Sequence, residues 1–214
     1  GVFAHSSERV DRPDLEYHVQ PLSLEKFGDP LHTFNAFTAS VCNLRPSSRG
    51  SVHIVSKDLN ALPVIDPNYL STEEDKKVAI ESVEVTRKIM RAEVFKTFMP
   101  QEYKPGAEVT GDKELLQKIG DIGTTIFHPV GTCKMGKADD PMAVVDSDLK
   151  VMGITGLRVA DASVMPTIVF WNLRGDTKDF PVRSNEQGVV MLSGYSPSLL
   201  TALLDGEEIT PLGI

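Results

Sequence analysis

A histidine followed directly by a proline, His128-Pro129, is the residue pair in this sequence best suited to chemistry. Because proline disfavours the α conformation of the residue before it, we expect extended backbone at His128. Gly131 and Thr132 then permit a sharp turn with exposed backbone N–H groups. Neutral imidazole accepts a proton from a hydroxyl group near pH 7, so His128 is a candidate general base. A purely structural role is the competing interpretation for a lone histidine in a loop.

A second candidate segment follows about thirty residues later in the chain. The apolar residues 157–160 predict a strand, and the strand ends in the acidic, small-residue turn Asp161-Ala162-Ser163. Backbone groups at such a strand end can meet a ligand. Asp161 could instead cap the turn that it begins.

The elements that must position these residues begin with strands in the N-terminal part. Alternating or β-favouring residue types predict strands at 14–20, 34–44 and 51–55. Three successive strands with short links favour an antiparallel sheet. Residues 63–69 contain two prolines and are interpreted as a rigid connector.

The clearest helix is predicted to start at Ser71, with Glu74 completing a capping box and Pro100 ending the helix. A second helix is predicted at 112–119, ended by the glycines that follow. The apolar residues of the first helix fall on one face, and they are Ala79, Ile80, Val83, Met90, Val94 and Phe98. We expect this face to pack inward.

The C-terminal part has a different pattern. A short strand is predicted at 144–145, and two further strands at 169–173 and 188–194. Ser196 and the proline after it have the residue types that open a helix, which we expect to reach Leu203 or Leu204.

Composition limits the possible functions. The 214 residues are 41% hydrophobic and 24% charged, as in a typical globular protein. The net charge of -8 argues against a nucleic-acid or anionic-membrane surface, and no apolar run is long enough to predict a membrane span. The chain opens without an initiator methionine, which is typical of the middle of a longer polypeptide.

No metal site is expected from the sequence. The two cysteines, Cys42 and Cys133, form neither a CxxC pair nor a zinc spacing. The histidines other than His128 also lack ligand spacing, and surface or sheet roles are expected for them: His5, His18, His32 and His53.

Several motifs in a fixed order resemble the C-terminal half of glucose-methanol-choline (GMC) oxidoreductases. They lie at 127–136, 144–146, 156–163 and 166–168, and include His-Pro-Val-Gly-Thr and Val-Ala-Asp-Ala-Ser. Upstream, Leu-Arg-Pro, Arg-Gly-Ser-Val and Ile-Asp-Pro-Asn-Tyr-Leu between residues 44 and 70 are similar to the family's substrate domain. Choline-dehydrogenase-like alcohol dehydrogenases are the members that this chain most resembles.

The resemblance implies FAD-dependent oxidation of a small-molecule alcohol. His128 matches the family's active-site histidine, which implies that it takes the hydroxyl proton while a hydride passes to the flavin. Asp161-Ala162 matches the segment that lies against the cofactor, and Pro166-Thr167 matches the backbone that approaches the flavin ring. Asn172 falls where the second catalytic histidine or asparagine would lie.

The sequence departs from the family pattern in two places. The glycine-rich motif G-x-G-x-x-G, which holds the ADP half of FAD, occurs nowhere, so an N-terminal FAD-binding region is an expected missing partner. After residue 168 the family pattern breaks, because Phe170 and Trp171 replace small residues. The tail 169–214 resembles the end of a von Willebrand A-like domain of an uncharacterised family. On that interpretation Asn172 belongs to a strand of a second, unrelated piece.

These patterns together predict an α+β fold, with an antiparallel or mixed sheet and flanking helices. We expect a partial substrate-binding domain at 1–125, the end of an FAD-binding domain with His128 at 126–168, and a divergent tail at 169–214. The predicted function is that of a C-terminal fragment of an FAD-dependent alcohol oxidoreductase, inactive by itself. A non-catalytic binding module, or the product of a fused or faulty gene model, is the alternative.

Overall fold

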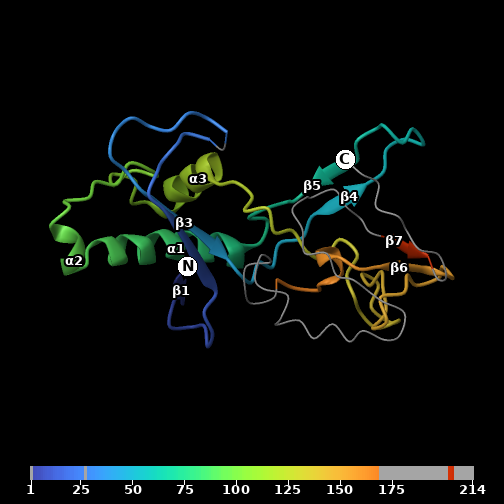
Figure 1. Cartoon of the computed structure of the whole chain (residues 1–214). Coiled ribbons are helices and arrows are strands. Elements are labelled where there is room, and N and C mark those ends of the chain that lie inside the picture. The colour runs from blue at the N-terminus through green and yellow to red at the C-terminus, as the bar shows by residue number, and fades with distance from the viewer. Residues whose placement is uncertain (1, 27, 169–201, 205–214) are drawn as a thin grey trace. The chain divides into compact units, whose positions relative to one another are not determined.

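The structure, a computed structural model, describes residues 2–26 and 28–168 together with the backbone of residues 202–204. The chain divides into two compact units, Gly1–Ile126 and Phe127–Ile214. Helices occur together with short antiparallel strands, so the fold is α+β (Figure 1). Of the helices within the described ranges, none combines the length and the apolar character that a membrane span needs.

The first unit contains a three-stranded antiparallel sheet in the order β1-β2-β3. Its strands are β1 (Val2–Ala4), β2 (Leu15–Gln20) and β3 (Thr38–Asn43). The register places Glu16 directly opposite Cys42. Because side chains alternate along a strand, the sheet presents two chemically different faces.

Helix α1 (Glu73–Met90) packs against one face of this sheet. Leu15 and Tyr17 of β2 and Val78 of α1 form the buried centre of the contact. The Tyr17 hydroxyl lies 3.0 Å from Oγ1 of Thr86 on the same helix. Partly buried side chains complete the cluster, namely Ala4, Ala39, Val41, Val85 and Ile89. Apolar burial, worth about 1.5–3 kcal/mol for a large side chain, therefore joins helix and sheet.

Thr72 caps the first turn of α1, and the prediction of Ser71 as the cap is wrong. Oγ1 of Thr72 accepts a hydrogen bond from the backbone N–H of Asp75 at 3.3 Å. The Asp75 carboxylate in turn accepts the backbone N–H groups of Ser47 and Ser48, both at 2.8 Å. Thr72 and Asp75 have the same spacing as Ser71 and Glu74, so the local pattern offers two caps one residue apart and does not choose between them.

The helix also buries a different stripe from the predicted one. Its buried positions are Asp75, Val78 and Ser82, which follow one another at helical spacing. Two of these three are polar, and Ser82 satisfies its hydroxyl by donating to the carbonyl of Ala79 at 2.7 Å. The predicted apolar positions within the helix are half-buried, namely Ala79, Ile80, Val83 and Met90. Because the prediction considered apolar residues only, it assigned burial to the positions beside the stripe that α1 actually buries.

The predicted continuation of this helix to Pro100 is wrong. The helix ends at Met90, and a separate short helix α2 (Glu93–Lys96) follows. Ala92 between them adopts an extended backbone, which interrupts the helical hydrogen bonds. The predicted apolar face beyond this break is exposed, by 68% at Val94 and 76% at Phe98.

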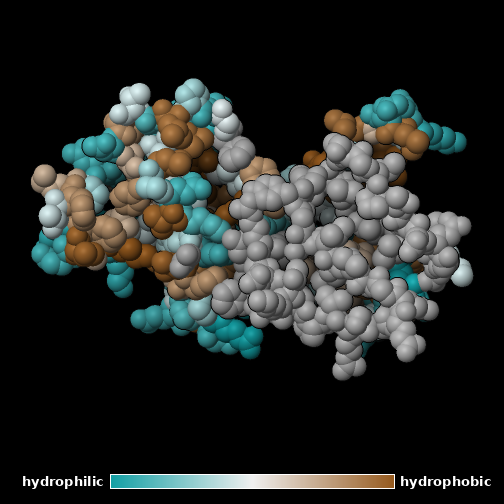
Figure 2. Space-filling model, viewed as in Figure 1, coloured by the Kyte–Doolittle hydropathy of each residue, from teal (hydrophilic) through white to brown (hydrophobic). Residues whose placement is uncertain are grey.

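Strands β4 (Ser51–His53) and β5 (Val64–Asp66) form a separate antiparallel hairpin. The first two predicted strands are confirmed as β2 and β3. The third predicted strand, β4, does not join their sheet, and the predicted connector 63–69 contains its partner β5. A Cβ on Gly50 would lie 2.0 Å from the Asp66 carbonyl oxygen, so glycine permits this close approach. Figure 2 shows hydrophobic surface on the hairpin, which carries exposed Val52, Ile54, Val55, Leu62, Val64 and Ile65.

Helix α3 (Asp112–Ile122) is the second predicted helix, and it extends three residues beyond the predicted end at Ile119. Gly120 lies inside it, and Gly123 is the cap residue, whose N–H donates to the Ile119 carbonyl at 2.7 Å. Leu115 is its buried anchor in the first unit.

The second unit packs around Val145, Val159 and Val164, which are buried. Val145 makes isolated bridges with Met135 and Val151 in place of the short strand predicted at 144–145. Partly buried side chains surround this centre, namely Cys133, Met135, Val144, Leu149 and Val151.

The predicted strand at 157–160 is confirmed as β6 (Leu157–Val159), which pairs antiparallel with β7 (Ala202–Leu204). The helix predicted to reach these last residues is therefore wrong at 202–204, since short apolar runs do not distinguish a helix from a strand. The predicted strands at 169–173 and 188–194 and the helix start at Ser196 lie outside the described residues.

Candidate active site

The loop that carries His128 begins the second unit. Phe127 has a φ of 63°, in the left-handed region that residues other than glycine rarely adopt. His128 is half-buried, while Pro129 after it is exposed. Gly131, with a φ of 84°, forms the predicted turn, and its carbonyl accepts the N–H of Lys134 at 3.2 Å. The strained residue next to His128 sets the direction in which the chain enters the loop.

Two backbone hydrogen bonds hold this loop against the turn that follows β6. The N–H of Cys133 donates to the Ser163 carbonyl at 3.0 Å, and the N–H of Met135 donates to the Val164 carbonyl at 2.8 Å. A Cβ on Gly131 would lie 3.5 Å from the Met165 carbonyl oxygen. The histidine loop and the 161–167 segment, which the sequence separates by about thirty residues, are therefore neighbours.

Asp161 caps the short 3₁₀ helix η1 (Ala162–Val164). Its Oδ1 accepts the backbone N–H of Ser163 at 2.8 Å and also the Ser163 hydroxyl. The Asp161 carboxylate therefore caps the turn that it begins, as the alternative interpretation expected. Pro166 and Thr167, which follow η1, are exposed.

Two charged side chains of the loop, Lys134 and Asp140, are paired with each other. Nζ of Lys134 donates to Oδ2 of Asp140 at 2.5 Å. This hydrogen bond, followed by one from the backbone N–H of Met142, lowers the pKa of the Asp140 carboxyl. Asn172, the second predicted catalytic residue, lies outside the described residues.

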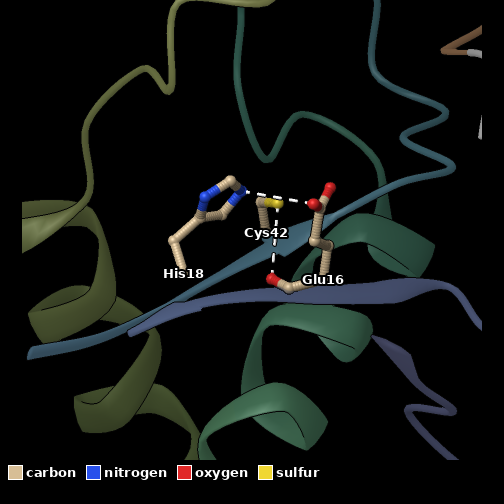
Figure 3. A group of neighbouring side chains, drawn as sticks. All are labelled: Glu16, His18 and Cys42. Carbon is tan, nitrogen blue, oxygen red and sulfur yellow. Dashed lines mark hydrogen bonds and ion pairs between the residues drawn. The ribbon is translucent and has the colours of Figure 1, made fainter. Parts of the chain in front are cut away.

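The first unit holds a cluster of side chains that the sequence analysis missed. Glu16, His18 and Cys42 lie together on β2 and β3, and Figure 3 shows their side chains pointing toward one another. Burial, and then the negative charge of Glu16, raise the pKa of the Cys42 thiol to about 11. Sequence spacing could not reveal this group, because the cysteine enters only through the register of two strands.

The sequence profile of the family described as GMC oxidoreductase matches residues 46–175 of this chain. A second profile, that of a domain of unknown function (DUF7788), matches residues 159–211. The two matches overlap where the family pattern was predicted to break. The matches do not support the predicted likeness of the tail to a von Willebrand A domain.

Curated relatives resemble most of the chain but extend well beyond it. An alcohol dehydrogenase [acceptor] from Pseudomonas putida is 41% identical over 177 residues, which are 83% of this chain and 32% of that protein. An oxygen-dependent choline dehydrogenase from Brucella anthropi is 41% identical over 174 residues, or 81% of this chain and 32% of the relative. The chain thus spans about a third of the length of these relatives.

A solved structure gives the same result at the level of the fold. The crystal structure of pyridoxine 4-oxidase from "Mesorbium loti" superposes with a TM-score of 0.68 at 28% sequence identity. The match covers 78% of this chain and 33% of that one. The α+β arrangement is therefore that of a flavin-dependent oxidoreductase. The chain belongs to the GMC oxidoreductase family, whose cofactor is FAD.

Proposed function

We propose that this chain supplies part of an FAD-dependent site that oxidises an alcohol, namely the residues that accept the proton of the substrate hydroxyl. The observation that carries the proposal is the pair of backbone hydrogen bonds from Cys133 and Met135 to residues 163 and 164. They hold the His128 loop beside the segment that matches the family's flavin-facing strand end. This anchoring of residues 133 and 135 supports the proposal, because a general base must be held in a fixed position.

His128 acts on the substrate hydroxyl in this proposal. One nitrogen of its neutral imidazole accepts the hydroxyl proton as the alcohol carbon is oxidised to a carbonyl. FAD, when bound, supplies the acceptor for the hydride that leaves the same carbon. The proton stays on the imidazole until it passes to solvent, so atoms and charge balance over the reaction.

The residues after β6 fit the flavin end of the cofactor. Pro166 and Thr167 are exposed beside a segment that hydrogen bonds fix in place, so their backbone can lie along a planar ring system. Ala162 is proposed to contact the cofactor as well. Asp161 is a positioning residue, because its carboxylate already holds the turn through Ser163. Asn172 lies outside the described residues and keeps its two interpretations, a second catalytic residue or part of an unrelated tail.

The described residues do not fit the nucleotide end of FAD. Dinucleotide-binding folds place the pyrophosphate on a glycine-rich turn, G-x-G-x-x-G, and this sequence contains none. We infer that tight FAD binding needs a nucleotide-binding region that these 214 residues do not include. Residues 1–125 would then contribute the substrate-binding side for a small alcohol.

The proposal is tested with the chain and a chimera. Purified chain is mixed with FAD and desalted, and the retained visible flavin absorbance is measured. The same measurement is made on the Pseudomonas putida alcohol dehydrogenase after residues 2–168 replace its corresponding third. The chain alone is expected to lose flavin, whereas the chimera is expected to retain it and to oxidise alcohols.

Two outcomes contradict parts of the proposal. Retained flavin with alcohol oxidation by the chain alone would show a self-sufficient enzyme. A folded chimera that binds flavin but oxidises no alcohol would favour a non-catalytic binding module.

A further inference from the structure

The sheet of the first unit has a polar face opposite the face that packs on α1. Leu15 and Tyr17 point into the core with α1, so the residues that alternate with them on β2 point away from that helix. Glu16 and His18 lie on this second face, and Cys42 joins them from β3 because it pairs with Glu16. These three side chains converge above the strands (Figure 3).

The Glu16 carboxylate lies beside one basic side chain, that of His18. Its side chain is only 9% exposed. Within the described part of the chain, the polar contact recorded for its carboxylate is with Nε2 of His18, at 3.5 Å. That contact is an ion pair only when the imidazole is protonated. A cation at this position would give the carboxylate a partner whose charge does not depend on the protonation of His18.

The distances suit a metal ion. One ligand atom from each of Glu16, His18 and Cys42 lies within 4.8 Å of the others. In a tetrahedral zinc site with bonds of about 2.0–2.3 Å, neighbouring ligand atoms are about 3.4 Å apart. The 3.5 Å between Oε1 of Glu16 and Nε2 of His18 already matches that edge. To close the site, the Cys42 thiol must give up its hydrogen bond to the Glu16 carbonyl, which is 3.4 Å long, and turn toward the pair.

We propose that Glu16, His18 and Cys42 bind a divalent zinc-like cation, with a fourth coordination position open to solvent. A mixed sulfur, nitrogen and oxygen ligand set is one that zinc accepts. Coordination replaces the proton of the Cys42 thiol, which is released to solvent, and the metal neutralises the thiolate and the carboxylate. The site lies wholly within the first unit and does not depend on the proposed flavin chemistry.

The site is tested with Co²⁺ as a spectroscopic probe. Metal-free full chain is titrated with Co²⁺, and the absorbance is followed for the charge-transfer band that a thiolate ligand produces. We expect a band that saturates at one cobalt per chain and that Zn²⁺ abolishes by competition. Cys42→Ser is expected to remove the band, while Glu16→Gln and His18→Asn weaken binding by about tenfold or more.

Matched controls separate this site from incidental binding. Cys133→Ser and His53→Asn change the other cysteine and an exposed histidine, and both are expected to keep the band. In the unmutated chain, Zn²⁺ is expected to slow alkylation of Cys42 but not of Cys133, a readout that needs no variant to fold. Three results would each overturn the proposal. They are the absence of the band in the unmutated chain, a band unaffected by Cys42→Ser, and an equal effect of Zn²⁺ on the alkylation of Cys42 and Cys133.

Discussion

The Asp161 carboxylate holds the turn that brings the end of β6 to the histidine loop. It accepts both the backbone N–H and the hydroxyl of Ser163, whose carbonyl accepts the N–H of Cys133. One side chain therefore links the strand end to the loop of His128. Helix caps of this type contribute about 0.5–2 kcal/mol.

Replacement of Asp161 should weaken this turn. Asp161→Ala is expected to lower the free energy of unfolding by about 1 kcal/mol, because it removes the acceptor for the N–H of Ser163. Asp161→Asn keeps an acceptor and is expected to cost less. Urea denaturation followed by circular dichroism measures both. Asp139→Ala, an exposed site in the same unit, is the control, and an equal effect there would contradict the assignment.

Glu25 offers a residue-scale test by pH. Hydrogen bonds from Lys104 and then from Tyr103 lower the pKa of its carboxyl to about 2. Since the folded-state pKa lies below the ordinary value of 4.5, the stabilisation is present above pH 4.5 and is lost as the pH falls through about 2. An NMR titration of the carboxyl carbon measures the shift. Lys104→Met is expected to return the midpoint toward 4.5, and an unchanged midpoint would exclude Lys104 as the main cause.

At the scale of elements, Asp75 joins the start of α1 to the loop before β4. Its carboxylate accepts the N–H groups of Ser47 and Ser48 and the Ser47 hydroxyl. Burial by itself raises the pKa of this carboxyl, but the hydrogen bonds from the two serines outweigh it and lower the pKa. The Leu-Arg-Pro-Ser-Ser segment is thus held by the helix that follows it.

Removal of the Asp75 carboxylate should destabilise the loop before β4. Asp75→Ala is expected to destabilise the chain by about 3 kcal/mol, because charge-assisted hydrogen bonds are lost and backbone donors remain unpaired. Chemical denaturation measures the loss. Glu84→Ala, exposed on the same helix, is the matched control. A difference between the two variants within about 0.5 kcal/mol would contradict this role.

The sequence predicted the existence of the main elements better than their partners. Strands β2, β3 and β6 and helices α1 and α3 follow from local periodicity. The pairing of β4 with β5 and the buried stripe of α1 depend on contacts between residues that local patterns do not join. Local patterns do not contain that information.

The candidate site was predicted in the same uneven way. His128 and the turn at Asp161 stood out through residue type and family resemblance, but only the structure shows the hydrogen bonds that make them neighbours. The Glu16, His18 and Cys42 group was missed entirely, because strand register and not sequence spacing brings it together.

At the scale of the whole molecule, the chain covers about a third of its curated relatives. The GMC profile and the profile of unknown function overlap at residues 159–175, a range that includes the segment against which the histidine loop is held. The described part contains the residues that we propose for proton acceptance. On the same proposal, residues outside these 214 hold the nucleotide end of FAD. The proposed chemistry is therefore measured in the chimera, which also supplies a nucleotide-binding region.

The rate of flavin reduction in the assembled chimera tests the central proposal most directly. Alcohol is mixed anaerobically with the flavin-loaded chimera in a stopped-flow instrument, and loss of the oxidised flavin absorbance is recorded. His128→Asn is expected to lower this rate by about 10²–10⁴-fold with flavin still bound, whereas His53→Asn leaves it unchanged. A His128→Asn rate within about threefold of the parent would contradict the role of His128 as the base.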